Sequence, residues 1–441
     1  MTRVFEHLDD RTDPSPGDPE LGKVMRRMRR RQRRTQLLSM GAATLLVVGV
    51  FAGIIALRTS GTPLATSETV YQFDSSKGPL AVGAPVPTTA LLDVDFASPT
   101  NGFALAAHNG QAILAASTDG GSTWIVQNSD LPSAFDQNNG FPGQIEFIGS
   151  HGYLWGKGEG VGGEAPLLVS DDSGQSWITA PIGPDVFDVS AIGSNIWALA
   201  STCDVSLSSP CPLNVEISTD WGDTWQIANG TSFMSISGLL SGEQPVELAR
   251  ITTSRAYVLT SGTTFGSATS LLFTADSGAS WVTLPVPCAG PYNLGAEIAA
   301  SSTEDLWLLC GGQGSGGEQS KELFRSSNGG MTWSLASSAS GAGSGGQLPL
   351  AGYVAPFSTG HKNLAVASAS TAWLKASGST LYVTHDGGST WKAVPDLLSA
   401  DFPGSGQGNV TFISGTQGWI SAYGVGLWRT TDGVTWTHLG S

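Results

Sequence analysis

Short stretches in which apolar and polar residues alternate recur along most of the chain, and turns rich in glycine, serine and aspartate separate them. Residues 92–105, 187–199, 298–309 and 410–421 show the unit clearly: an apolar alternation, a short polar turn, and a second apolar stretch with an aromatic residue. Alternation with a period of two is typical of strands that bury one face. The pattern therefore predicts antiparallel strand pairs, repeated many times, rather than amphipathic helices.

One stretch breaks this alternation. Residues 37–57 form a run of 21 residues without a charged side chain. As a helix, such a run spans about 31 Å, close to the hydrocarbon thickness of a bilayer. The ten basic residues of 1–36 gather mostly in 23–34, directly before the run. Because basic residues stay on the cytoplasmic side, we expect a single-pass helix in the cell membrane with a cytoplasmic N-terminus.

A cleaved signal peptide is the other interpretation of this N-terminus. Its charged region would be 36 residues long, and its apolar run would exceed the usual ~7–15 residues, so the uncleaved anchor is favoured. We therefore expect a basic, disordered cytoplasmic tail (1–36), a transmembrane helix (37–57), an extracytoplasmic stalk (58–90) and one large exported domain (91–441).

A second motif, with the consensus S/T-x-D-x-G-x-S/T-W, occurs seven times in the exported domain. The copies are 117–124, 170–177, 218–225, 274–281, 326–333, 384–391 and the shorter 430–436. Their closing tryptophans lie 53, 48, 56, 52, 58 and 45 residues apart. Each repeat holds four predicted strands, A to D, and strand B carries the aromatic residue: Phe103, Tyr153 or Trp155, Trp197, Tyr257, Trp307, Trp373 and Trp419. The sequence thus predicts an all-β fold, a seven-bladed β-propeller of four-stranded antiparallel blades.

The residue types of this motif, here called the Asp box, favour a structural role. An Asp side chain bonds backbone amides two residues on, Gly allows positive φ, and Trp buries a large apolar surface. The acidic positions are Asp119, Asp172, Asp220, Asp276, Asn328, Asp386 and Asp432, and the tryptophans are Trp124, Trp177, Trp225, Trp281, Trp333, Trp391 and Trp436. Asn328 can still bond the backbone, whereas the last box is one residue short and needs a different turn.

With these seven boxes in register, residues 91–441 resemble the Asp-box, or bacterial neuraminidase, repeats. The domain as a whole resembles the seven-bladed propellers of the photosystem II stability and assembly factor family, and more distantly the sortilin-type and sialidase propellers. The resemblance is specific for the fold and implies a binding or assembly role. The photosystem partner of that family is not carried over, because no residue of this chain indicates a photosynthetic context.

The two faces of such a propeller are expected to differ. The A–B and C–D turns share one face and are short, whereas several B–C and D–A connections on the other face are long. Binding residues concentrate on loops that a rigid scaffold carries, so the long-loop face is the candidate binding face. Its acidic candidates, all in B–C connections, are Glu159, Glu164, Asp204 and Glu318. The alternative is that these glycine-rich loops are tolerated insertions without a function.

The four cysteines of the chain lie toward the same face. An exported compartment permits disulfides, and of the three possible pairings we favour Cys203–Cys211 and Cys288–Cys310. Metal binding is less favoured, because neither His nor Cys lies near them at the spacing of a zinc site. We therefore predict neither a metal nor a cofactor.

Charge and missing motifs narrow the function. The part after residue 57 carries eleven basic and thirty acidic residues, which makes a nucleic-acid partner unlikely on electrostatic grounds. A sialidase site needs three clustered arginines and a Tyr nucleophile. Beyond the stalk the only arginines are Arg250, Arg255, Arg325 and Arg429, and two of them directly precede Asp boxes. No nucleophile, metalloprotease or phosphate-binding motif appears.

Two functions remain. The first is a membrane-anchored, non-catalytic binding or assembly scaffold for a protein or peptide. The second is an exported carbohydrate-active protein, either a glycoside hydrolase that uses two carboxylates or a lectin, with its site on the long-loop face.

Overall fold

The computed structural model describes most of residues 80–440. The described residues are 80–136, 143–156, 166–183, 185–201, 211–228, 234–236, 246–260, 270–288, 296–315, 318–339, 348–349, 352, 363–375, 381–394, 397 and 408–440. The predicted transmembrane segment 37–57, the tail before it and residues 58–79 lie outside this part. Among the described residues, no helix is both long and apolar enough to cross a membrane.

Within the described residues the strands form seven antiparallel sheets, each following the chain order. Blade 1 comprises β1 (Leu91–Phe96), β2 (Gly102–His108), β3 (Gln111–Ser117) and β4 (Ile125–Asn128). Blade 2 comprises β5 (Gln144–Ile148), β6 (His151–Trp155), β7 (Leu168–Ser170) and β8 (Ile178–Thr179). Blade 3 comprises β9 (Asp185–Ile192), β10 (Asn195–Ser201), β11 (Cys211–Ser218) and β12 (Gln226–Ile227), and β13 (Met234–Ile236) also pairs with β11.

The remaining four blades repeat the same order. Blade 4 comprises β14 (Val246–Arg250), β15 (Ala256–Thr260), β16 (Ser270–Thr274) and β17 (Val282–Leu284). Blade 5 comprises β18 (Ala296–Ala300), β19 (Leu306–Ser315), β20 (Glu318–Ser326) and β21 (Ser334–Ala339). Blade 6 comprises β22 (Leu364–Val366), β23 (Ala372–Lys375), β24 (Leu381–Thr384) and β25 (Lys392–Ala393). Blade 7 comprises β26 (Gly408–Phe412), β27 (Gly418–Ala422), β28 (Gly426–Thr430) and β29 (Trp436–Leu439).

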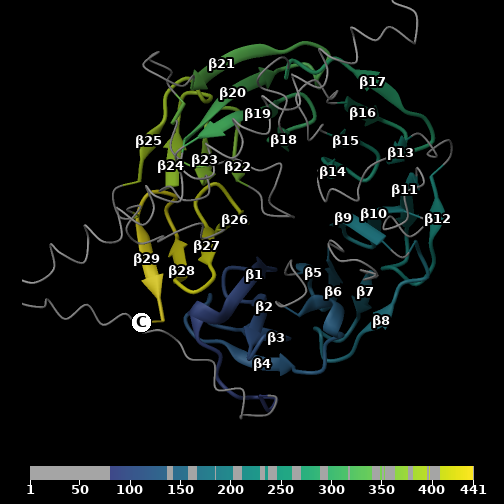
Figure 1. Ribbon diagram of the computed structural model, residues 1–441, viewed down its shortest axis with the longest axis vertical. Helices are drawn as coiled ribbons and strands as arrows, with labels where there is room; N and C mark the ends of the chain where they lie inside the picture. Colours follow the sequence, from purple (N-terminus) through teal and green to yellow (C-terminus); the bar gives the residue numbers. More distant parts are fainter. Residues whose placement is uncertain are drawn as a thin grey trace, which may run out of the picture. The chain divides into compact units, whose positions relative to one another are not determined.

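The seven sheets stand around one axis, with the first strand of each innermost and the fourth outermost (Figure 1). Each innermost strand contacts the innermost strand of the next blade, and β26 of blade 7 contacts β1 of blade 1. This arrangement confirms the predicted seven-bladed propeller with four-stranded blades. In this arrangement the faces of each sheet are buried, because the two neighbouring blades cover them.

The apolar core is divided among the seven seams between adjacent blades. The seam between blades 1 and 2, for example, holds Leu105 and Leu114 from blade 1 and Phe147 and Leu154 from blade 2. Strand alternation produces this division, because side chains of successive residues point to opposite faces of a sheet and so enter opposite seams. The predicted aromatic residues of the second strands are buried here, with Tyr153 and Trp197 fully inaccessible.

Short turns gather on one side of the propeller, here called the box side. The backbone amide of Gly120 in the first Asp box donates to the carbonyl of Thr100 in the β1–β2 turn, at 2.8 Å. Corresponding bonds join the box and the first turn in blades 2 to 6. The opposite side, which carries the β2–β3 type and between-blade connections, is here called the loop side.

The ring closes without a strand shared between the first and last blades among the described residues. Residues 80–90, which the sequence analysis assigned to the stalk, lie against this junction. The amide of Val86 donates to the carbonyl of Trp124 at 2.9 Å, beside the outer strand of blade 1. The hydroxyl of Thr88 donates to the carbonyl oxygens of Leu439 and Gly440 in blade 7. This segment therefore bridges the two terminal blades from outside.

Candidate functional site

The Asp boxes are closed by a repeated set of hydrogen bonds. In blade 1 the Ser117 hydroxyl donates to Asp119 Oδ1 at 2.8 Å and accepts from the amide of Gly121 at 2.9 Å. The carboxylate of Asp119 then accepts from the amide and the hydroxyl of Thr123, at 2.9 and 2.7 Å. In the six full-length boxes the accepted amide lies four residues on rather than the expected two. The longer span lets a single carboxylate close the whole turn.

Two boxes depart from this pattern as their sequences do. Asn328 keeps the acceptor bond from the Thr332 amide at 2.9 Å, and its own amide donates to the Thr332 hydroxyl at 2.8 Å. In the shortened seventh box, Asp432 Oδ1 accepts from the amide of Thr435, three residues on, at 2.7 Å. The shortened seventh box does have the expected bond two residues on, in which Asp432 accepts from the amide of Val434 at 2.8 Å. The Asn328 box shows that the turn requires an acceptor at this position rather than a charge.

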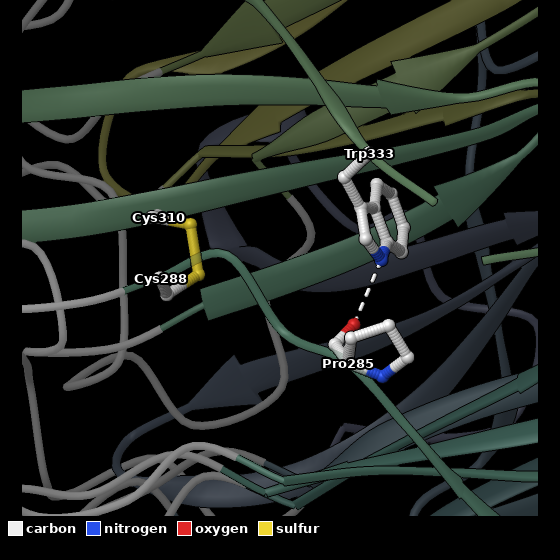
Figure 2. Close-up of a disulfide and its surroundings, with 4 residues drawn as sticks. All are labelled: Pro285, Cys288, Cys310 and Trp333. Carbon is white, nitrogen blue, oxygen red and sulfur yellow. Dashed lines mark hydrogen bonds between the residues drawn. A yellow bond between two sulfur atoms is a disulfide. The ribbon is translucent and has the colours of Figure 1, made fainter. Parts of the chain in front are cut away.

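The box tryptophans differ in burial. Trp124 and Trp436 are buried, whereas Trp177, Trp225, Trp281, Trp333 and Trp391 are partly exposed. In blade 1 the Trp124 indole donates back to the carbonyl of Gly121 at 3.0 Å, and Trp177, Trp225 and Trp391 do the same in their blades. Trp333 instead donates to the carbonyl of Pro285 in blade 4, at 2.9 Å (Figure 2).

The boxes of blades 1, 3, 5 and 7 also accept a hydrogen bond from an aromatic side chain of the preceding blade. Trp373 and Trp419 donate through their indole nitrogens to the carbonyls of Gly433 and Gly120 in the next box. In blade 2 the hydroxyl of Tyr153 donates to the carbonyl of Trp221 in the box of blade 3. In blade 4 the hydroxyl of Tyr257 donates to the carbonyl of Gly329 in the box of blade 5. In these seams, therefore, the aromatic residue on the second strand of one blade contacts the Asp box of the next blade.

Three arginines add further contacts between neighbouring blades. The Arg250 guanidinium lies 4.8 Å from the ring centroid of Trp197, and that of Arg325 lies 3.8 Å from the ring centroid of Trp307. Arg325 also donates to the carbonyl of Gly387 in the sixth box at 3.0 Å. Arg429 donates to the carbonyl of Asp119 in the first box at 3.3 Å. These three arginines lie in different seams, so they do not form the cluster that a sialidase needs.

Of the four predicted acidic candidates, only Glu318 lies within the described residues. Glu159, Glu164 and Asp204 lie outside the described residues. Glu318 is described: it is exposed at the start of β20, opposite Ser315 at the end of β19. The expected B–C loop of blade 5 is therefore largely a hairpin, because both strands continue past the end of the blade. The amide of the Gln319 side chain braces it by donating to the carbonyl of Gly312 at 2.9 Å.

A disulfide lies on the loop side of the propeller. Cys288 follows the last strand of blade 4, Cys310 lies in β19 of blade 5, and their Cα atoms are 5.5 Å apart (Figure 2). Both residues are buried in the seam between these blades. The favoured partner pair Cys203–Cys211 lies outside the residues whose side chains are described. The disulfide anchors the base of the projecting hairpin to the preceding blade.

The innermost strands carry a further set of polar residues, which the sequence analysis missed. One hydrogen-bonding side chain stands at the same position of each blade, before an apolar residue: Asp93, Gln144, Asp188, Glu247, Glu297, Asn363 and Asn409. Asp188 accepts from the amide of Leu248 at 2.7 Å, and Glu247 accepts from the amide of Ile298 at 2.9 Å, each in the next blade. Aligning the first strands of the repeats would have revealed this position.

These acceptors face the edge amides of the inner strands, which would otherwise lack partners. At the junction of the ring, Asp93 accepts from the amide of Ile145 in blade 2 at 3.0 Å and from the side-chain amide of Asn409 in blade 7. Burial is the largest influence on this carboxyl and raises its pKa to about 7. The inner carboxylates therefore serve the scaffold, and the described residues contain no group of three or more side chains suited to hold a metal ion.

Comparisons with known proteins agree with this architecture. The family described as photosynthesis system II assembly factor YCF48 matches residues 81–201. The photosystem II assembly lipoprotein Ycf48 of Synechococcus sp. (strain CC9902) is 24% identical over 225 residues, which cover 46% of this chain and 57% of that protein. The match thus spans little more than half of the relative's length.

The chain is also similar to two solved structures. YCF48 bound to D1 peptide aligns with a TM-score of 0.51 and 20% identity, over 79% of this chain and 96% of that one. YCF48 from Cyanidioschyzon merolae aligns with a TM-score of 0.49 and 16% identity, over 80% and 99%. At these identities the first likeness supports the fold alone. The chain is a seven-bladed Asp-box β-propeller that resembles the photosystem II assembly factor family.

Proposed function

We propose that this chain is a non-catalytic scaffold that holds a peptide segment of a protein partner on the loop side of its propeller. The match of residues 81–201 to the assembly-factor family carries the proposal. A relative of that family has been solved with a D1 peptide, so peptide binding by this fold has a precedent. The D1 peptide is accordingly the first probe for the present chain.

The polar chemistry of the described residues supports a role without catalysis. Arg250, Arg325 and Arg429 bind backbone carbonyls of neighbouring blades. Glu247 and Glu297 accept backbone amides of the next blade. A general acid or nucleophile must reach its substrate, whereas these groups are occupied by the scaffold. This favours binding over glycoside hydrolysis.

The same proposal includes the membrane. The curated relative is named a lipoprotein, and in this chain the apolar run 37–57 would provide the attachment. A scaffold tethered beside the membrane meets its partner at a raised effective concentration, so a modest affinity is sufficient.

Binding of a fluorescent D1 peptide to the full-length chain tests the proposal. We expect saturable binding, with a scrambled peptide binding at least about tenfold more weakly, a difference of 1.4 kcal/mol. A panel of fluorogenic glycosides, tested on the same preparation, should show no turnover. Glycoside cleavage without peptide binding would overturn the proposal.

Substitution of two exposed glutamates of blade 5 tests on which side of the propeller the peptide binds. Glu318 lies at the tip of the loop-side hairpin, and Glu304 lies in the β18–β19 turn on the box side. Glu318→Lys should change the affinity for the D1 peptide, because it reverses a charge on the proposed binding side. Glu304→Lys is the matched control and should leave the affinity unchanged. An effect of Glu304→Lys alone would place the site on the box side and contradict the proposal.

A further inference from the structure

Lys321 occupies an unusual position in the projecting hairpin of blade 5. It lies in β20, three residues after Glu318, and its side chain is fully inaccessible to solvent. Lysine is rarely buried completely, because removing an ammonium group from water costs several kcal/mol unless hydrogen bonds compensate. Burial accordingly lowers the pKa of Lys321 to about 7, and the nearby Glu318 counteracts part of this shift.

The strand alternation shows where this side chain is directed. Gln319, Lys321 and Leu323 are buried, whereas the residues between them are partly exposed. Leu323 belongs to the apolar cluster of the seam between blades 5 and 6, together with Leu348. Because residues two apart share a face of the strand, Lys321 enters the same seam at its loop-side end.

Two hydrogen bonds connect Lys321 to two separate segments. Its Nζ donates to the carbonyl of Gln319 within the hairpin and to the carbonyl of Pro349 in the connection between blades 5 and 6, both at 3.1 Å. Gln319 in turn donates to the carbonyl of Gly312 in the opposite strand of the hairpin. The ammonium thus joins a projecting hairpin to a segment that follows β21.

Leu348, which precedes Pro349, is held in place by packing and by one backbone hydrogen bond. Leu348 is buried in the seam, and its amide donates to the carbonyl of Ser338 at 3.4 Å. A methionine at position 321 would pack equally well here but could not donate to either carbonyl. The distinctive contribution of the lysine is therefore directional: it sets the distance between the hairpin and the Leu348–Pro349 segment.

We propose that Lys321 is a positioning residue, which holds the β19–β20 hairpin and the Leu348–Pro349 segment as one composite surface for the bound peptide. The inference rests on the proposed function, since it assigns a part of the loop side to the peptide. Lys321 itself is buried and does not touch the ligand. Its effect on binding is indirect, through the placement of Glu318 and of the neighbouring segment.

The test compares Lys321→Met with Tyr257→Phe in the full-length chain. Tyr257→Phe removes the hydrogen bond to the Gly329 carbonyl on the box side, so it lowers stability without touching the hairpin. We expect Lys321→Met to weaken D1 peptide binding about tenfold or more, and Tyr257→Phe to leave it within about twofold. Lys321→Arg, which retains a buried donor, should restore part of the affinity.

Hydrogen exchange provides a readout that does not depend on the ligand. Lys321→Met should accelerate amide exchange in residues 311–320 and 348–349, and should leave the Asp box of blade 5 (326–333) unchanged. If the wild-type chain binds no D1 peptide, the proposed function fails, and this exchange pattern alone decides on Lys321. Unchanged exchange, or equal losses of affinity in Lys321→Met and Tyr257→Phe, would overturn the inference.

A second variant, at the Leu348–Pro349 end of the contact with Lys321, keeps the test possible if Lys321→Met does not fold. Leu348→Ala removes the side chain that seats the segment in the seam while Lys321 remains. If Lys321→Met does not fold, Leu348→Ala takes its place with the same expected losses. Wild-type affinity together with wild-type exchange in Leu348→Ala would then overturn the proposal.

Discussion

The indole nitrogen of Trp419 donates a 3.0 Å hydrogen bond to the carbonyl oxygen of Gly120, although 299 residues separate the two in the chain. Trp419 also stacks on Phe96, with ring centroids 3.6 Å apart. Blade 7 and blade 1 are thus joined by the same contact that joins other neighbouring blades. The last seam is a regular seam, which explains how the ring closes without exchanging a strand.

Trp419→Phe tests this seam. The substitution leaves the Gly120 carbonyl without its indole donor and removes apolar volume from a residue that is 1% exposed. We expect a loss of about 2–4 kcal/mol in the free energy of unfolding. Urea denaturation measures it, with the exposed-strand variant Thr437→Ala as the control. A loss below about 0.5 kcal/mol would show that the seam is not a cooperative part of the fold.

Gly183→Ala examines a close backbone approach on the loop side. A Cβ atom at Gly183 would lie 2.2 Å from the carbonyl oxygen of Ser201, and backbone there cannot rotate away as a side chain would. Gly156, whose added Cβ meets no atom closer than 3.4 Å, is the matched control. We expect Gly183→Ala to lower the free energy of unfolding by about 2 kcal/mol or more, which a lower melting temperature in thermal denaturation would show. Equal melting temperatures for the two variants would contradict the approach.

From the pKa values of the Asp-box carboxyls we expect the protein to lose stability at acidic pH. Hydrogen bonds from the Thr224 and Ser280 hydroxyls and amides lower the pKa values of Asp220 and Asp276 to about 2. A carboxyl whose pKa is lowered by folding stabilises the protein above its unfolded value, near 3.9, and this contribution disappears as the pH falls through the folded value. The thermal midpoint should therefore decrease between about pH 4 and pH 2.

Asp276→Asn is the control for that decrease. Asn328 shows that an amide can replace the carboxylate and still accept the box amide. The variant should fold, and its decrease between pH 4 and pH 2 should be smaller than that of the wild type. An identical decrease in both proteins would assign the acid sensitivity to other carboxylates.

From the buried carboxyls of the inner strands we expect stability to decrease as the pH increases toward and past neutrality. Burial raises the pKa values of Asp93 and Asp95 to about 7 and about 6. When folding raises a carboxyl pKa, its contribution to stability is complete below the unfolded value and is lost as the pH increases through the folded value. The midpoint of urea denaturation should therefore decrease from about pH 5 to pH 8.

Asp93→Asn removes the titrating group at the ring junction. Its carbonyl oxygen can still accept one backbone amide, so the variant should show a flatter profile than the wild type over this pH range. A level wild-type profile would mean that the bonds from Ile145 and Asn409 outweigh the cost of burying the charge.

The repeat, the number of blades and the order of strands could be predicted because their signals are local. A box such as 117–124 carries its acceptor, its glycine and its tryptophan within eight residues, and alternation marks the strands around it. The two atypical boxes were also foreseeable, since Asn328 and the shortened seventh box differ in their own residues. The length of the blade 5 hairpin was not foreseeable, because glycines at 311, 312 and 314 are typical of loops rather than strands.

The blade contacts depended on information that no single segment contains. Trp419 meets Gly120, and Asp93 meets both Ile145 and Asn409, each across a seam between sheets. Lys321 meets Pro349 in the connection between two blades. Which acceptor faces which donor depends on the rotation of one blade against the next, and packing in the seams decides that rotation. Local alternation and turn chemistry therefore specified the blades, whereas only their assembly around the axis decided which polar residues stabilise the ring and which remain exposed.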